Sequence, residues 1–330
     1  MSDVLHVVSI GGGNGLSTLL QGLKLYSQSP PEGAPRIDIS AIVTVTDDGG
    51  SSGRLRREFD VLPPGDIRNC MVALSEDEAL LSRLFQYRFH AGRGLKGHSF
   101  GNLFLTALTE VIGNFSDAVK ASSEVLKIGG RIYPSTEKNV TLEAVLEDGS
   151  MVRGETRISR SRRRIEKIRL NPARCRPHPD TLAAIAEADL ITLGPGSLFT
   201  SVVPNLLVLG ISQAIRRARA VKAYFVNLMW QPGETSNFTA SDHIRAIEKH
   251  AAGRLLDYAI VNTEPIRISL RERYARQQAL PVENDLKRIE KMGIKVVGGN
   301  FLQQLQKVRH NPEEIAAVAM RLAREGRSRR

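Results

Sequence analysis

Short apolar runs typical of buried strands alternate with helical repeats along most of this chain, and this alternation constrains the fold more than any other feature. Leu16, Leu19, Leu20 and Leu23, for example, recur at three- and four-residue spacing after the apolar run 5–10. They predict a helix with one face packed on a sheet. Strands that alternate with helices predict a parallel sheet covered by helices. We therefore predict an α/β fold with a doubly wound, mostly parallel, Rossmann-like sheet.

The individual elements follow from the same patterns. We expect strands at residues 5–10, 37–46, 190–193, 221–228, 258–262 and 294–297. We expect helices after the first glycine loop and at residues 67–74, 78–87, 102–112, 116–126, 180–187, 205–219, 240–251, 266–278 and 313–324. Both α/β portions are expected to form one sheet, so that residues 1–330 make a single domain.

One stretch, at about residues 128–170, breaks the alternation of strand and helix. Residues 140–155 alternate between apolar and polar side chains and contain Asp148-Gly149, a strong hairpin signal. We therefore expect a small antiparallel β-hairpin subdomain inserted in the domain.

The net charge of +11 is concentrated in two places. Residues 153–176 contribute +8 and residues 321–330 contribute +4, which leaves the remaining chain close to neutral. Such runs are most often solvated faces or frayed ends, and the second one is expected to be a basic tail. Only 5% of the residues are aromatic, which argues against a base-stacking surface. Nucleic acid is therefore an unlikely partner.

Targeting signals and cysteines bear on the cellular location. No apolar run approaches the roughly 18 residues that a membrane span needs. The N-terminal apolar run is short and continues directly into glycines, unlike a signal peptide. Cys70 and Cys175 are isolated from each other. We expect a cytoplasmic protein with reduced thiols and no membrane partner.

The first loop that could bind a ligand is the glycine-rich segment 11–15, between a strand and a helix. In neither register does it complete the dinucleotide fingerprint, because Leu16 and Thr18 stand where glycine is needed, and no Lys-Ser/Thr pair follows it. Exposed backbone N–H groups at a helix N-terminus nevertheless favour a phosphate. Tight packing is the alternative reading. The candidate ligand residues here are Gly12, Gly13, Asn14 and Gly15.

The second loop, residues 47–53, follows the apolar run 39–46. Its glycines let backbone N–H groups converge on one point, and two serines add donors, which suits an oxyanion. A Mg²⁺ ion held by one aspartate together with ligand phosphates is chemically reasonable, with Asp48 as the candidate metal ligand. A bare turn, or capping by one aspartate, is the alternative. The candidates are Asp47, Asp48, Gly49, Ser51 and Ser52.

Two more loops, residues 194–201 and 227–235, mix glycine with amide, hydroxyl or carboxylate groups after apolar strands. All four loops would form one crevice if the sheet is parallel throughout. Charge-assisted hydrogen bonds of about 1.5–3 kcal/mol each could supply the roughly 8 kcal/mol that micromolar binding of a diphosphate needs, without a lysine. The candidates are Gly194, Gly196, Ser197, Thr200, Asn227 and Gln231. No acid–base or nucleophile set stands out, so no catalytic residue is assigned.

Two further segments could contribute side chains to this crevice. Residues 97–101 match the nucleophile elbow of esterases, but a flexible basic loop precedes them instead of a strand, which argues against a hydrolase. His98 and Asn102 are expected to line the crevice from a helix start, or His98 is only a cap. In the turn 63–69, Asp66 is a ligand candidate or an N-cap. Arg68 and Asn69, in the first turn of the helix that follows, are also ligand candidates.

The runs 10–16, 44–54, 62–69, 97–106, 193–201 and 231–235 resemble the CofD/YvcK-like proteins, specifically the YvcK branch called gluconeogenesis factor. The resemblance covers essentially the whole chain. It implies a nucleotide-type ligand at the strand ends, notably UDP-N-acetylglucosamine or another UDP-sugar. It also implies a role in cell shape and wall synthesis during gluconeogenic growth, with a cell-wall-synthesis regulatory protein as a partner. Tyr274 and Arg309 are weaker candidates for sugar or uracil contacts, and each could equally be a surface residue.

The related CofD branch implies a different activity. Its members transfer a phospholactyl-type group from a nucleotide diphosphate donor to a deazaflavin precursor, with Mg²⁺. That branch carries an acidic Pro-Asp-Leu-Asp-Thr-like run where this chain reads Pro-Gly-Asp-Ile-Arg at 64–68, which counts against the transferase alternative. Asn14 replaces a threonine common in YvcK-type loops. A nicotinamide oxidoreductase is disfavoured because both glycine registers fail, and a homodimer is expected from base rates alone.

Overall fold

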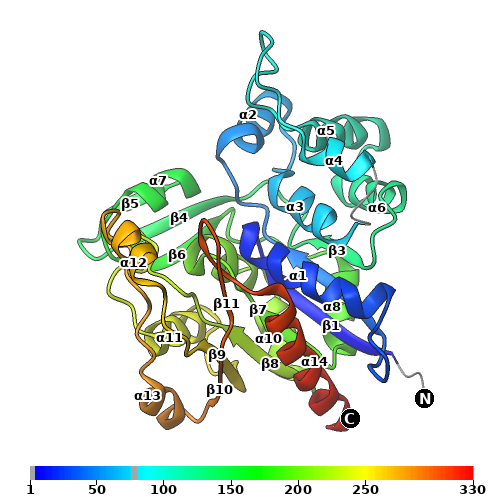
Figure 1. Ribbon diagram of the computed structural model, residues 1–330. Helices are drawn as coiled ribbons and strands as arrows, with labels where there is room; N and C mark the ends of the chain where they lie inside the picture. The colour runs from blue at the N-terminus through cyan, green and yellow to red at the C-terminus, as the bar shows by residue number, and fades with distance from the viewer. Residues whose placement is uncertain (1–3, 76–79, 330) are drawn as a thin grey trace.

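The computed structural model describes residues 4–75 and 80–329 and is organised around a seven-stranded, wholly parallel sheet (Figure 1). Its strand order is β10-β9-β8-β7-β1-β2-β3. The strands are β1 Leu5–Gly11, β2 Ile37–Val43, β3 Arg131–Pro134, β7 Leu190–Leu193, β8 Val221–Phe225, β9 Tyr258–Asn262 and β10 Lys295–Gly299. The predicted fold class is confirmed.

Two strands are shorter than the sequence predicted, and one was missed. We predicted strands at 37–46 and 221–228, but β2 ends at Val43 and β8 at Phe225. Val45 and Val226 are nevertheless buried, so their apolar character reflects core packing beyond the strand ends. The missed strand, β3, pairs in parallel with β2 at the sheet edge, within a segment that we assigned to the insertion.

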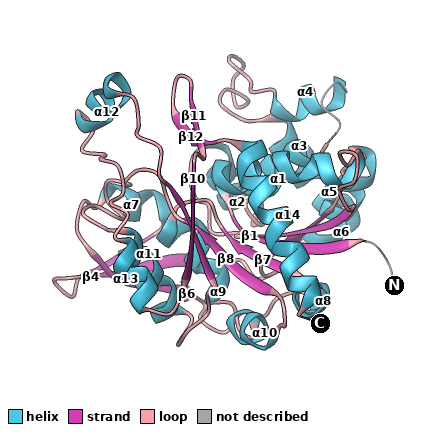
Figure 2. Ribbon diagram, turned by 60° about the horizontal axis from the view of Figure 1, so that its bottom comes forward, coloured by secondary structure: helices cyan, strands magenta, loops and turns pink. Residues whose placement is uncertain are grey.

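Helices cover both faces of the sheet, as predicted (Figure 2). On one face α1 packs against α3 and α14, and on the other α8 and α9 contact β1 while α10 packs against both of them. The predicted helices are α1 Gly13–Gln28, α3 Gly65–Leu74, α4 Leu80–Gln86, α5 Phe100–Ile112, α6 Phe115–Val125, α8 Pro179–Glu187, α11 Ala240–His250, α12 Ile268–Ala275 and α14 Pro312–Ser328. Residues 78–79 of the helix expected at 78–87 lie outside the described residues.

The continuous helix predicted at 205–219 is wrong. The chain instead forms a π-helix η1 at Leu198–Val202, a single turn α9 at Val203–Leu206, and α10 at Ile211–Arg217. Gly210 separates the two α-helices with a φ of 91°, in the left-handed region that glycine tolerates. The described elements also include α2 Gly50–Phe59, α7 Glu155–Arg160, α13 Leu286–Lys291 and a hairpin of β11 Leu302–Gln304 with β12 Val308–His310, none of which we predicted.

The inserted antiparallel sheet has the order β5-β4-β6. β4 Thr141–Leu146 and β5 Met151–Arg153 form the predicted hairpin around Asp148-Gly149, and β6 Ile165–Asn171 pairs with the other edge of β4. Helix α7 lies between β5 and β6. The insertion therefore begins after β3, later than the predicted boundary near residue 128.

The C-terminal basic segment is not the frayed end that we expected. Helix α14 continues to Ser328, and the Arg327 side chain donates to Asp189 Oδ1 at 2.9 Å and Oδ2 at 2.7 Å. Asp189 is completely buried, and it also accepts from the backbone N–H of His6. The last described turns of the chain are thus tied to the ends of β1 and β7 away from the crevice.

Within residues 4–75 and 80–329, no single helix has the length and apolar composition of a membrane span. The bent pair of segments 198–206 and 211–217 meets that test only when the two are taken together.

Candidate functional site

The strand order reverses direction between β1 and β7, because the chain proceeds to β2 and β3 on one side and to β8, β9 and β10 on the other. Open α/β sheets bind ligands at the carboxyl ends of strands at such a point. A cavity of about 360 Å³ lies there. Its lining residues come from the loops after β1, β7 and β8, from α12 and from β12: Gly12, Gly13, Asn14, Gly15, Thr18, Pro195, Gly196, Ser197, Ser201, Asn227, Leu228, Met229, Trp230, Gln231, Tyr274, Val308, Arg309 and His310.

The turn between β1 and α1 is tighter than the five-residue loop that we expected, since β1 ends at Gly11 and α1 begins at Gly13. Gly13 has a φ of 61°. At Gly15 a Cβ atom would lie 2.4 Å from the Pro195 carbonyl oxygen and 2.8 Å from Gly196 Cα. The N-terminus of α1 therefore sits directly against the loop after β7, and both backbones face the cavity.

A chain of polar side chains connects the loops after β7 and β8. Gln231 Nε2 donates to Ser197 Oγ at 2.6 Å, and Asn227 Nδ2 donates to Gln231 Oε1 at 3.1 Å. The hydroxyl of the buried Tyr224 donates to Asn227 Oδ1 at 3.4 Å. These contacts fix three predicted ligand candidates in one row along the crevice.

The outer wall of the crevice comes from α12 and the β11–β12 hairpin. The Tyr274 hydroxyl accepts from the Val308 backbone N–H at 3.2 Å, which joins the two elements. Arg309 is exposed, and its guanidinium has no hydrogen-bond or ion-pair partner among the described residues. Trp230 is half-buried and donates from Nε1 to the Phe238 carbonyl at 3.0 Å. An exposed positive charge and an indole thus border the cavity.

The second predicted loop folds differently from our expectation. Gly50, Ser51 and Ser52 begin helix α2 instead of lying in a flexible loop. The Gly49 N–H donates to Asp47 Oδ1 at 2.8 Å, and Ser52 also hydrogen-bonds that carboxylate. These residues do not line the 360 Å³ cavity.

His98 and Asn102 also lie outside this cavity, where they contact the two serines at the start of α2. His98 Nδ1 lies 3.0 Å from Ser51 Oγ, and Asn102 Nδ2 donates to Ser52 Oγ at 3.4 Å. Ser99, the serine of the elbow-like motif, is the N-cap of α5 and is buried, so it is not presented as a nucleophile. The start of α5 therefore supports α2 and does not form a wall of the cavity.

Asp66 lies between the Asp47 carboxylate, in the loop after β2, and the crevice at the N-terminus of α1. The Gly13 N–H hydrogen-bonds its carboxyl group, and a Cβ atom on Gly12 would lie 2.6 Å from Asp66 Oδ2. Burial, followed by the nearby Asp47 carboxylate, raises the pKa of Asp66 to about 7. Asp66 is thus not a simple N-cap, since it places a titrating carboxyl group at the N-terminus of α1.

Two further acids were not predicted as site residues. Glu155, at the start of α7, has its pKa raised well above the usual value by burial and by Asp66 and Asp47. Burial also raises the pKa of Glu234, which accepts from Ser159 Oγ at 3.2 Å and Thr200 Oγ1 at 3.2 Å. Glu155 lies in the insertion, where no strand end signals it in the sequence. Glu234 lies in a loop that we had recognised.

Asp48 has a structural contact that bears on its role as a metal candidate. Its Oδ1 accepts from Thr156 N at 2.9 Å and from Thr156 Oγ1 at 2.6 Å, which anchors α7 to the loop after β2. Across residues 4–75 and 80–329 no cluster of three or more His, Cys, Asp or Glu side chains has the arrangement of a metal site. Asp66 is closer to the crevice, since its carboxyl group accepts from the Gly13 N–H, and the nearby Asp47 carboxylate contributes to the raised pKa of Asp66.

The remaining candidates also lie off the cavity. Arg68 donates to Asn69 Oδ1 at 2.5 Å and to the Phe85 carbonyl, so the two side chains bind each other. Gly194 adopts a φ of 70° at the end of β7, and Thr200 is buried in η1 against Glu234. The candidates that do line the cavity are Gly12, Gly13, Asn14, Gly15, Gly196, Ser197, Asn227, Gln231, Tyr274 and Arg309.

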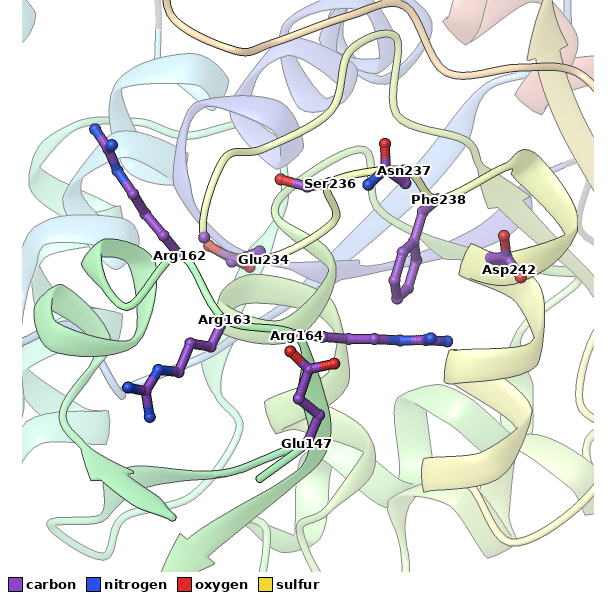
Figure 3. A pocket seen from close by; sticks show the side chains of 10 residues that line it. Glu147, Arg162, Arg163, Arg164, Glu234, Ser236, Asn237, Phe238 and Asp242 are labelled. Carbon is purple, nitrogen blue, oxygen red and sulfur yellow. The ribbon is translucent and has the colours of Figure 1, made fainter. Parts of the chain in front are cut away.

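Part of the basic run lies at a separate cavity of about 410 Å³ between the insertion and the loop after β8. Figure 3 shows Arg164 extending beneath Phe238, while Arg162 and Arg163 point away from it. Glu147 and Asp242 also line this cavity, and Arg163 pairs with Asp148. Both signs of charge are present there, so the arginines do not form a uniform anion-binding surface.

Comparison with known proteins identifies close relatives. The family described as 2-phospho-L-lactate transferase CofD matches residues 7–302. The putative gluconeogenesis factor of a Nostoc species is 49% identical over 96% of this chain and 68% of its own length. The gluconeogenesis factor of Bacillus subtilis is 43% identical over 98% of this chain and 100% of its own length. A crystal structure of a UPF0052 family member from Bacillus halodurans superposes with a TM-score of 0.91 at 43% identity, over 96% of this chain and 99% of the other.

Proposed function

The chain belongs to the CofD family, in the branch whose relatives are named gluconeogenesis factors, and from this premise we propose that it binds a nucleoside diphosphate sugar such as UDP-N-acetylglucosamine. The ligand would occupy the crevice beside the ends of β1 and β7. The proposal includes a cytoplasmic location and a role in cell shape and wall synthesis during gluconeogenic growth, exerted through a regulatory partner protein.

The observation that carries this proposal is the close approach of two glycine-containing backbones at one cavity. The first N–H groups of α1 have no intrahelical acceptor, and the helix dipole favours a negative charge beside them. The Gly13 N–H already bonds the Asp66 carboxyl group, which leaves Asn14 and Gly15 as the donors nearest to a ligand. Ser197 and Gln231 add side-chain donors on the opposite side. A diphosphate satisfies this donor set without a lysine.

The rest of the ligand would extend toward α12 and the hairpin. Tyr274 offers an aromatic face, and Arg309 offers a positive charge without a partner among the described residues. An adjoining cavity of about 260 Å³ shares Asn227 and Leu228 with the crevice and includes Asn262 and Asn284. Amide side chains can recognise the polar edges of a base or a sugar. We therefore propose that the diphosphate lies at α1 and that the nucleoside or the sugar lies on the hairpin side.

Isothermal titration calorimetry with UDP-N-acetylglucosamine, UDP and uridine tests this function. We expect micromolar binding of the first two and much weaker binding of uridine, because uridine lacks the diphosphate. Arg309→Gln should weaken UDP-N-acetylglucosamine binding by about tenfold or more, the value of one charge-assisted hydrogen bond. Trp230 fluorescence should change on binding, since its indole borders the cavity.

Lys307→Gln is the matched control, because it removes the same charge from the same hairpin at a residue outside the cavity lining. The affinity of the Lys307→Gln variant for UDP-N-acetylglucosamine should equal that of the unaltered protein. No binding of UDP-N-acetylglucosamine or UDP at millimolar concentration would refute the proposed function.

A group-transfer activity is the second candidate, and the buried acids favour it. Asp47 and Asp66 would hold a Mg²⁺ ion, which would neutralise ligand phosphates. Asp66 would orient the ligand through the Gly13 N–H, and Glu155, whose pKa burial raises, would lie near it. Mg²⁺-dependent turnover of a nucleotide diphosphate donor, abolished in Asp47→Asn and in Asp66→Asn, would support the transferase. Turnover that survives both changes would exclude this metal role.

A further inference from the structure

The π-helix η1 brings to the crevice one side chain that the sequence did not indicate, Ser201. Its N–H and the Val202 N–H both donate to the Ser197 carbonyl, at 2.9 and 3.0 Å, and the second contact is the i→i+5 bond of a π-helix. Single π-helical turns occur frequently at functional sites. Ser197 and Ser201 both line the crevice, whereas Thr200 between them donates to Glu234. The π-helix thus places two hydroxyl-bearing residues at the cavity.

The Ser201 hydroxyl is enclosed by the protein but makes no hydrogen bond with it. Ser201 is only 7% exposed, and its hydroxyl has no hydrogen-bond partner among residues 4–75 and 80–329. The oxygen is not among the fully buried atoms that lack a partner, so its remaining accessible surface faces the crevice that the residue lines. Because enclosing a hydroxyl without a partner costs free energy, this group is best explained by a ligand that completes its hydrogen bond.

Backbone contacts hold Ser201 in this position. The completely buried Asn205 donates from Nδ2 to the Ser201 carbonyl at 2.8 Å and to the Gly11 carbonyl at 3.2 Å. One amide group therefore ties η1 to the end of β1. Since the N–H and the carbonyl of Ser201 are both engaged within the protein, the hydroxyl is the group left for a ligand, and its supporting contacts fix it in advance.

The same hydroxyl lies where the two glycine-containing backbones of the crevice meet. A Cβ atom on Gly13 would lie 3.8 Å from Ser201 Oγ, and Cβ atoms on Gly12 and Gly196 would each lie 3.5 Å from Ser201 Cβ. Ser201 is therefore next to the turn after β1 and to the loop after β7 at once. A phosphate group held between these backbones has this hydroxyl within reach.

We propose that Ser201 binds the β-phosphate of the ligand and makes the site selective for nucleoside diphosphates over monophosphates. This inference rests on the proposed function, and it assigns the α-phosphate to the N–H groups of Asn14 and Gly15 at the start of α1. Ser197 accepts from Gln231 Nε2, so its own hydroxyl proton remains free to be donated. The Ser197 and Ser201 hydroxyls thus form a second donor set on η1. A diphosphate occupies both sets, and a monophosphate occupies only the first.

Calorimetric titration with UDP and with uridine monophosphate (UMP) tests the proposal. The unaltered chain should bind UDP about tenfold more tightly than UMP, or better, because UMP lacks the β-phosphate. Ser201→Ala should weaken UDP binding by about tenfold, the value of one charge-assisted hydrogen bond, and should change UMP binding by less than about twofold. Ser201→Cys keeps the size of the side chain but replaces the hydroxyl with a weak donor, so it should lose UDP affinity in the same way.

Ser9→Ala is the matched control. Ser9 of β1 is a completely buried serine whose hydroxyl also lacks a partner among the described residues, but it does not line the crevice. Its UDP and UMP affinities should equal those of the unaltered chain, and thermal unfolding checks that all three variants are folded.

Three results would overturn the proposal while leaving the proposed function in place. These are an unchanged ratio of UDP to UMP affinity in Ser201→Ala, equal losses for the two ligands, and UDP affinity that Ser201→Cys retains in full, which would show that the side chain only fills space. No binding of UDP by the unaltered chain would refute the proposed function and this inference together.

Discussion

At the scale of single residues, the crevice depends on the absence of side chains at specific glycines. Gly15→Ala should destabilise the protein by about 1–3 kcal/mol, the usual effect of overpacking, because its Cβ would meet the Pro195 carbonyl group at 2.4 Å. The same change should weaken nucleotide binding, since the start of α1 must move away from the loop after β7. Chemical denaturation and calorimetry measure the two effects.

Gly11→Ala is the matched control for this prediction. It lies in the same turn, but its Cβ would make ordinary contacts of 3.5 Å with Leu16 and 3.8 Å with Gly194. Stability close to that of the unaltered chain is expected. Equal destabilisation by both alanines would contradict this prediction. It would show that any side chain in this turn destabilises the protein, whether or not its Cβ meets the loop after β7.

Asp66 makes a pH-dependent contribution that can be measured. Its folded-state pKa of about 7 lies above the usual aspartate value of 3.8, so ionisation opposes folding. The stability associated with the neutral form is complete below about pH 3.8 and is lost as the pH rises through about 7. Asp66→Asn removes this loss, so the variant should gain stability relative to the unaltered chain between pH 5 and pH 8, by more than about 1.4 kcal/mol, the value of one pKa unit.

Denaturant unfolding in a chelating buffer at both pH values measures this gain. Glu187→Gln, which alters an exposed carboxyl group, should show no such pH-dependent gain. A gain for Asp66→Asn that is identical at pH 5 and pH 8 would contradict the raised pKa.

At the scale of elements, the contact between α14 and the sheet gives a further prediction. Arg327→Met removes the ion pair between Arg327 and the completely buried Asp189 carboxylate, and removing one partner of a buried pair typically costs about 3–5 kcal/mol. We therefore expect a large loss in the free energy of unfolding. Arg321→Met in the same helix alters an exposed side chain and should have little effect. Equal stabilities of the two variants would contradict this role of α14.

Strong periodic signals in the sequence predicted most of the parallel sheet and its covering helices. The helix α2 could not be predicted in the same way, because Gly49, Gly50 and Gly53 are poor helix formers, and tertiary contacts through Ser51 and Ser52 determine their conformation. We predicted that the C-terminal arginines form a solvated tail, because the sequence does not reveal that the buried Asp189 pairs with Arg327.

Part of the candidate site was equally visible in the sequence. Glycines after strands indicated the loops after β1 and β7, and Asn227 and Gln231 followed the next strand. The cavity also includes Tyr274 and Arg309, which only the family resemblance had suggested. Glu155 could not be found by either approach, since its electrostatic interaction with Asp47 and Asp66 depends on how the inserted sheet packs against the main one.

At the scale of the whole molecule, the parallel sheet brings segments near residues 12, 196, 230 and 309 to one crevice. The insertion supports this arrangement through two anchors, since Thr156 binds Asp48 after β2 and Ser159 binds Glu234 after β8.

The central claim is that backbone N–H groups at the ends of β1 and β7 hold a diphosphate. A crystal structure with UDP-N-acetylglucosamine tests it most directly. The account predicts phosphate oxygens within about 3 Å of the backbone nitrogen of Asn14 or Gly15 and of the Ser197 side chain. A diphosphate bound at the arginine-lined cavity beside Phe238, or turned toward Tyr274 with no contact to α1, would contradict it.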